Sequence, residues 1–130
     1  MIQYLFLMFL CHFVDDFFLQ GMCLSNLKQK KFWQETAPDK LYRYDYLMGL
    51  FCHAFMWAIS IMIPTMISGN FIWWLVPINT AIHFTVDDIK ANRHKINLII
   101  DQSIHFIQIA LTFLVCYVWM WKDSICLVIN

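Results

Sequence analysis

Four long apolar stretches dominate this chain, and each one carries ionisable side chains. They cover residues 2–23, 46–67, 71–89 and 96–121. A helix needs ~20 predominantly apolar residues to cross a bilayer. With 61% apolar and 14% charged residues in a chain of 130, a soluble domain would expose too much apolar surface. The pattern predicts an all-α membrane protein, with one domain built as a bundle of four transmembrane helices.

Composition excludes several other classes of protein. The formal net charge is zero, so no long-range field favours nucleic acid as a partner, and the lipid bilayer is the partner expected. The first apolar stretch lacks a preceding basic segment, which predicts a retained span rather than a signal peptide. The cysteines form no CxxC pair, which favours buried thiols over disulfides or a zinc ribbon. They are Cys11, Cys23, Cys52, Cys116 and Cys126.

Basic residues predict the orientation in the membrane. The connector 25–45 holds five of them and the connector 90–95 holds three, whereas the turn 68–70 has no charge. Positively charged connectors stay in the cytoplasm. We therefore expect a protein of the cytoplasmic (inner) membrane with both termini outside, and we expect Lys28–Lys31 to be a solvated charge run.

Histidines and carboxylates recur at helical spacing inside the four stretches. The set consists of His12, Asp16, His53, His83, Asp87, Asp101 and His105. Side chains four residues apart share one helix face, and Asn79 and Gln108 extend two of these faces by about a turn. Counted from the cytoplasmic ends at ~1.5 Å per residue, Asp16, His53, His83 and His105 fall in one layer, with Asp87 and Asp101 nearer the surface. Ionisable groups in a membrane are costly unless they meet one another, so this layer predicts a functional site.

The residue types in this layer favour a divalent metal ion. Imidazole and carboxylate together suit Zn, Mn or Fe, as one ion or two. The expected ligands are His12, Asp16, His83, Asp87, Asp101 and His105. Catalytic or supporting roles are expected for Asp16 as acid or base, His53 beside the ligands, Lys90 as the group that neutralises a phosphate, and Gln20 and Gln102 as hydrogen-bonding groups that orient a substrate.

Some positions leave alternatives open. Asp15 adjoins Asp16 and Asp88 adjoins Asp87, and the spacing does not decide which acid of each pair is functional. Neighbouring residues point in different directions on a helix, so we expect Asp15 and Asp88 to face away from the layer. His53 taken alone is more typical of a hydrogen-bonded contact between helices than of a metal ligand.

The ordered motifs resemble those of a known family. Residues 12–20 read HFVDDFFLQ, residues 52–55 CHAF, residues 83–90 HFTVDDIK and residues 101–105 DQSIH. In this order they are similar to the motifs of a small bacterial and phage membrane family, domain-of-unknown-function family 3307. The resemblance covers nearly the whole chain and implies a polytopic membrane protein whose polar motifs belong together. It supplies no activity.

Three functions fit these observations. The first is a metal-dependent hydrolase of a lipid-linked or phosphorylated substrate, in which a metal-bound water is the nucleophile. The second is a transporter or channel subunit for metal ions or protons; the nearly apolar outer half of each span argues against it, although a homo-oligomer would provide another path. The third is a membrane partner in which the polar layer only fixes helix packing.

Overall fold

All described secondary-structure elements of this chain are helices or helical turns. The computed structural model describes the backbone of residues 2–129 and the side chains of residues 2–122, so Cys126 lies outside the described side chains. The elements are α1 (Ile2–Val14), the π-helical turn η1 (Asp15–Leu19), α2 (Gly21–Leu27), α3 (Lys30–Thr36), the 3-10 turn η2 (Lys40–Tyr42), α4 (Asp45–Ile67), α5 (Leu75–Ala91) and α6 (Leu98–Ile129). The prediction of an all-α protein is confirmed.

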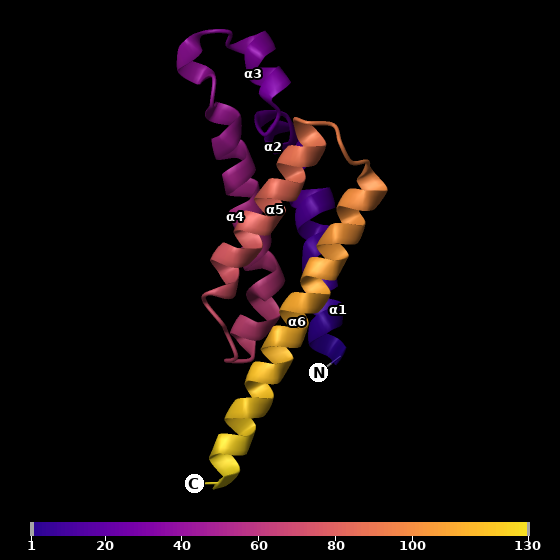
Figure 1. Ribbon diagram of the computed structural model, residues 1–130, viewed down its shortest axis with the longest axis vertical. Helices are drawn as coiled ribbons and strands as arrows, with labels where there is room; N and C mark the ends of the chain where they lie inside the picture. Colours follow the sequence, from indigo (N-terminus) through magenta and orange to yellow (C-terminus); the bar gives the residue numbers. More distant parts are fainter. Residues whose placement is uncertain (1, 130) are drawn as a thin grey trace.

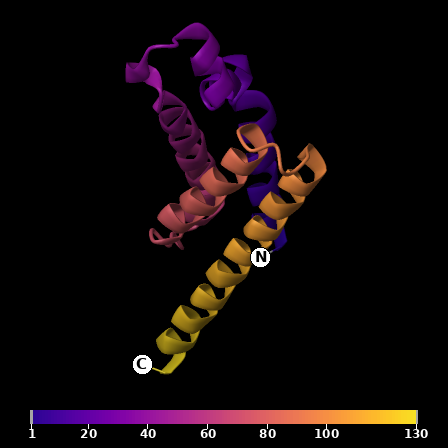
Figure 2. The ribbon, with the colours of Figure 1, turned by 45° about the horizontal axis from the view of Figure 1, so that its top comes forward.

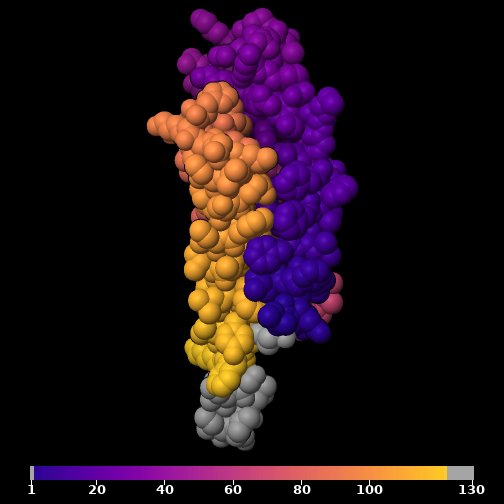
Figure 3. Space-filling view, turned by 90° about the vertical axis from the view of Figure 1, so that its right-hand side faces the viewer, coloured from indigo at the N-terminus to yellow at the C-terminus, as the bar shows by residue number. Residues whose placement is uncertain are grey.

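Four of these helices run side by side, and two short ones lie at one end. Helix α4 packs against α1 and α5, while α6 packs against α5 and α1 (Figure 1). Helices α2 and α3 sit at the end where α4 begins (Figure 2). On another face the indigo α1 lies against α6, whose yellow part extends beyond it, and the purple segment that contains α3 projects beyond the α5–α6 turn (Figure 3).

Three segments are long and apolar enough to cross a membrane: Ile2–Leu19, Lys40–Ile67 and Leu98–Lys122. The fourth expected span, 71–89, is present as α5, but this helix has 17 residues and is not among the three. Helix α5 is less apolar because it carries Asn79, His83, Asp87 and Asp88. At ~1.5 Å per residue it is about 25 Å long, slightly shorter than a typical hydrocarbon core.

Apolar side chains lie both inside and outside the bundle. A buried cluster that includes Met8, Trp57, Ile61 and Ile109 fills the half of the bundle near the N-terminus. Large apolar side chains are also exposed on every long helix, for example Phe6 (67% exposed) and Leu111 (59%). An exposed apolar surface of this extent is costly in water and is typical of a protein embedded in lipid.

A glycine allows the short helices to dock closely on the bundle. A Cβ atom on Gly49 of α4 would lie 2.7 Å from both the carbonyl carbon and the carbonyl oxygen of Leu27. Only glycine therefore lets the C-terminal end of α2 pack directly against α4. Trp33 Nε1 donates to the carbonyl oxygen of Leu27 (2.8 Å), which holds α3 against the same turn and directs the next residue, Lys28, into the bundle.

Candidate metal centre

The π-helical turn η1 turns two neighbouring carboxylates inward. A π turn contains an additional residue and often occurs at functional sites; here Gln20 N donates to the carbonyl oxygen of Asp15 (2.9 Å). Asp15 is 4% exposed and the Asp16 side chain 9%. The expectation that Asp15 faces away is therefore wrong, because the π turn at 15–19 departs from the residue spacing of a regular α-helix.

His53 of α4 lies between these two carboxylates. Asp15 Oδ2 is 3.8 Å from His53 Nδ1, and Asp16 Oδ1 is 3.5 Å from His53 Nε2. The ring is 2% exposed. Asp15 thus lies near His53 Nδ1 and Asp16 lies near His53 Nε2. The Nε2 atom is directed toward the centre of the bundle.

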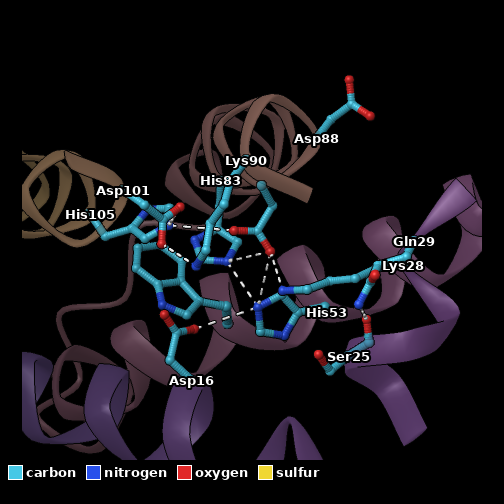
Figure 4. Close-up of polar contacts among 12 residues, drawn as sticks. Asp16, Ser25, Lys28, Gln29, His53, His83, Asp88, Lys90, Asp101 and His105 are labelled. Atoms are coloured by element: carbon cyan, nitrogen blue, oxygen red, sulfur yellow. Dashed lines mark hydrogen bonds and ion pairs between the residues drawn. The ribbon is translucent and has the colours of Figure 1, made fainter. Parts of the chain in front are cut away.

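Helix α5 adds His83 and Asp87, one turn apart on the same face. His83 Nε2 lies 3.1 Å from His53 Nε2. Asp87 Oδ2 lies 3.5 Å from His53 Nε2 and 3.8 Å from His83 Nε2. Figure 4 shows Asp16, His53 and His83 pointing toward one another from three different elements, so the predicted layer is brought together here.

Helix α6 closes the layer with Asp101 and His105. His105 Nε2 is 3.5 Å from Asp101 Oδ1 and 3.6 Å from Asp87 Oδ1, and its ring stacks on that of His83 with centroids 4.1 Å apart. Lys90 Nζ donates to Asp101 Oδ2 at 2.6 Å. Lys90, predicted to neutralise a phosphate, therefore has a carboxylate partner, while its side chain stays 33% exposed.

Two overlapping groups of side chains in this layer have separations that suit metal coordination. The ligating atoms of Asp16, His53 and His83 lie within 4.8 Å of one another, as do those of His83, Asp87 and His105. With bonds of about 2.0–2.2 Å, neighbouring ligands of a tetrahedral ion are about 3.3–3.6 Å apart. The distances from His53 Nε2 to Asp16, His83 and Asp87 are 3.5, 3.1 and 3.5 Å. Among described side chains, Asp16 Oδ1 and His105 Nε2 are buried without a hydrogen-bond partner, as free ligand atoms would be.

His12, a predicted ligand, is occupied by other partners. Trp57 Nε1 donates to His12 Nδ1 (2.8 Å), so the neutral ring carries its proton on Nε2, which lies 3.0 Å from Gln102 Oε1. Gln102 Nε2 in turn donates to Asp16 Oδ2 and Asp101 Oδ2, both at 3.1 Å. His12 and Gln102 therefore orient the carboxylates, and neither belongs to the two groups of ligating atoms.

Replacing Trp57 with Phe is expected to loosen this network while retaining the aromatic packing. The buried Nδ1 atom of His12 would lose the hydrogen bond that Trp57 donates, which costs about 1–3 kcal/mol for a buried polar group. Thermal unfolding in detergent measures the loss. Replacing Trp119, an exposed aromatic, with Phe is the matched control; an equal loss in both variants would contradict the role given to the Trp57 hydrogen bond.

Lys28 is a functional candidate that the sequence did not indicate. Its Nζ donates to Asp87 Oδ2 at 2.6 Å, the residue is 8% exposed, and Figure 4 shows the side chain reaching in toward the cluster. The prediction that Lys28 belongs to a solvated charge run is wrong. Once the Gln20 amide is oriented to satisfy its neighbours, its oxygen accepts from the same ammonium group, which places Gln20 beside the centre.

The structure also distinguishes Asp87 from Asp88. Asp88 points away from the cluster (Figure 4) and accepts from Arg93 Nε at 2.9 Å, as expected for a residue outside the layer. His94 is exposed in the following loop. Asp87 is therefore the member of this pair that lies with the histidines.

The comparison with protein families agrees with the motifs. A family model described as "Protein of unknown function (DUF3307)" matches residues 4–129. The chain belongs to the DUF3307 family. No curated protein and no solved structure matches it, so the chemistry of this DUF3307 protein has to be inferred from its own residues.

A second polar cluster of the DUF3307 chain lies deeper in the bundle. Gln108 Nε2 and Thr112 Oγ1 donate to Asn79 Oδ1 at 2.8 and 3.0 Å. Asn79 and Gln108 lie on the faces that the spacing predicted. Between α5 and α6, the half of the bundle away from the connectors 25–45 and 90–95 is thus more polar than the sequence predicts. This polar strip ends at the buried apolar residues Leu75 and Cys116.

Proposed function

We propose that this chain is an integral membrane protein that binds one divalent transition-metal ion between four transmembrane helices. We further propose that the ion serves the hydrolysis of a phosphorylated or lipid-linked substrate. The excess of basic residues in the connectors 25–45 and 90–95 supports an inner-membrane protein with these connectors in the cytoplasm and both termini outside. The ligands we propose are Asp16, His53, His83 and Asp87, with His105 beside them.

The balance of buried charges carries the metal proposal. Four carboxylates surround the centre: Asp15, Asp16, Asp87 and Asp101. Two ammonium groups, those of Lys28 and Lys90, pair with them. With the imidazoles neutral, as metal ligation requires, four negative and two positive charges leave two negative charges in a medium where uncompensated charge is very costly. One divalent cation restores neutrality, whereas two would create an excess of two positive charges.

The polar edge of the centre supports a hydrolase. A divalent ion held by these residues would supply Lewis-acid activation of a water for attack on a phosphoester. Lys90, whose side chain stays 33% exposed while it pairs with Asp101, would contact a phosphate from the connector side, and Gln20 and Gln102 would hold the charged groups next to the ion. Asp16, which contacts both His53 and Gln102, would hold the ion and thereby fix the position of the water.

A second candidate is a transit site for metal ions or protons. The buried cluster of Asn79, Gln108 and Thr112 favours it, because it extends the polar strip by about two helical turns. The buried apolar side chains of Leu75 and Cys116 follow at the end of that strip. Transit would therefore need a homo-oligomer or a rearrangement, and we rank it below hydrolysis.

The first experiment is to purify the protein in detergent and measure bound metals by elemental mass spectrometry. We expect one equivalent of zinc, manganese or iron, which is lost in a His83→Ala variant that retains its helical circular dichroism. Hydrolysis of phosphoesters and lipid phosphates is then compared between metal-loaded and chelated protein. A wild type that stays metal-free after supplementation would refute the metal site; metal-dependent ion uptake into proteoliposomes, without hydrolysis, would favour transit.

A further inference from the structure

A cationic pocket lies outside the metal centre, at the end of the bundle where α4 begins. Its volume is about 270 Å³, and three cations line it, those of Lys30, Lys40 and Arg43. The rings of Trp33 and Tyr42, which also line the pocket, stack with centroids 6.4 Å apart and an interplanar angle of 16°. Two aromatic rings thus form a rigid wall beside a group of positive charges.

Within the described residues 2–122, this pocket keeps a net positive charge, because three cations face one carboxylate. None of the three cations there forms an ion pair with a carboxylate. The one carboxylate in the lining, Asp39, is engaged with the backbone, because its Oδ1 accepts from Leu41 N at 2.9 Å. The pocket therefore suits an anion.

An apolar groove of about 420 Å³ adjoins this pocket and shares the Trp33 side chain with it. Leu24 and Leu27 form one side, and Met48, Gly49 and Cys52 of α4 form the other. The carboxylate of Asp45 also lines the groove, so the combined lining of pocket and groove has three cations and two acids. Met48 is 65% exposed, which opens the groove toward the surface that would face lipid. A cationic pocket and an apolar groove that meet at one tryptophan match the two ends of an amphiphile.

We propose that the pocket and the groove together bind one anionic phospholipid. Its phosphate lies among Lys30, Lys40 and Arg43, and one acyl chain lies along Met48 and Cys52. Lys40 and Arg43 directly precede α4, which places them at headgroup level in the proposed orientation, where anionic lipids attract basic side chains. Free phosphate would fill the pocket but leave the groove uncovered, so a lipid is the better occupant. This site requires the proposed membrane insertion and is independent of the metal.

The test counts lipids bound to the intact protein by native mass spectrometry, with phosphatidylglycerol or phosphatidylcholine added to delipidated protein in detergent. We expect one tightly held phosphatidylglycerol and at least tenfold weaker retention of phosphatidylcholine. The variant K40Q/R43Q should bind phosphatidylglycerol at least tenfold more weakly. The control K31Q/K95Q removes one charge from each of the connectors 25–45 and 90–95, at residues outside the pocket, and it should bind like the wild type.

A third variant examines the groove without changing the charge. Met48→Trp fills the groove and should weaken the binding of phosphatidylglycerol, whereas glycerol phosphate should not compete with the lipid. Equal losses in K40Q/R43Q and K31Q/K95Q would overturn the proposal, as would equal retention of the two lipids or full competition by glycerol phosphate. Bound metal and helical circular dichroism are measured on each variant, so that a loss of lipid is compared only among folded proteins.

Discussion

Replacing Asp87 with Asn is expected to abolish metal binding and to destabilise the protein, whereas the same change at the adjacent Asp88 should do neither. Asp87 is 2% exposed, pairs with Lys28 and lies next to three histidines. Without its charge, the Lys28 ammonium group would stay buried and unpaired, which costs about 3–5 kcal/mol. Elemental mass spectrometry and thermal unfolding in detergent measure the two effects.

Asp88→Asn is the matched control for this experiment. It makes the same chemical change one residue along the chain. Because the Asp88 carboxylate of the wild type pairs with the exposed side chain of Arg93, we expect its loss to lower the free energy of unfolding by less than about 1 kcal/mol. If Asp87→Asn does not fold, Asp87→Glu preserves the charge while moving the carboxylate, and it should fold with weaker metal binding. Full metal occupancy in Asp87→Asn, or equal loss in Asp88→Asn, would refute the site.

The sequence allowed a prediction of the helices and of most of the polar layer, because both depend on local spacing. His83 and Asp87, like Asp101 and His105, are four residues apart, and an α-helix places such pairs on one face whatever surrounds them. The cost of burying ionisable groups then required the faces to meet. Once α5 is known to be a regular helix, the same periodicity shows that Asp87, and not Asp88, shares a face with His83.

The remaining features depend on contacts between distant residues. Asp15 joins the layer because the chain takes a π-helical turn at 15–19, for which the local sequence contains no recognised signal. His12 is predicted to be a ligand, but it accepts a hydrogen bond from Trp57, 45 residues away in the sequence, and therefore acts as an orienting residue. Lys28 enters the bundle because α2 docks at Gly49, and a basic connector gives no indication of such docking.

Lys28→Met is expected to shift stability and metal affinity in opposite directions. Without metal, the change leaves Asp87 as a buried carboxylate that has lost its ammonium partner, and this costs about 3–5 kcal/mol. With metal, the ion neutralises the charge on Asp87 Oδ2, the oxygen that pairs with Lys28 and lies 3.5 Å from His53 Nε2. The variant should therefore be rescued by metal more strongly than the wild type.

The affinity change has the same electrostatic origin. In the wild type, the ammonium group 2.6 Å from Asp87 Oδ2 shares that oxygen with the ion, and two cations on one oxygen repel each other. Removing one of them should strengthen metal binding by at least about tenfold, as measured by competition with a chelating dye. Lys31→Met, at an exposed residue, is the control and should change neither quantity. Weaker metal binding in Lys28→Met would show instead that Lys28 positions Asp87 as a ligand, because the loss of an ordering contact would then outweigh the relief of repulsion.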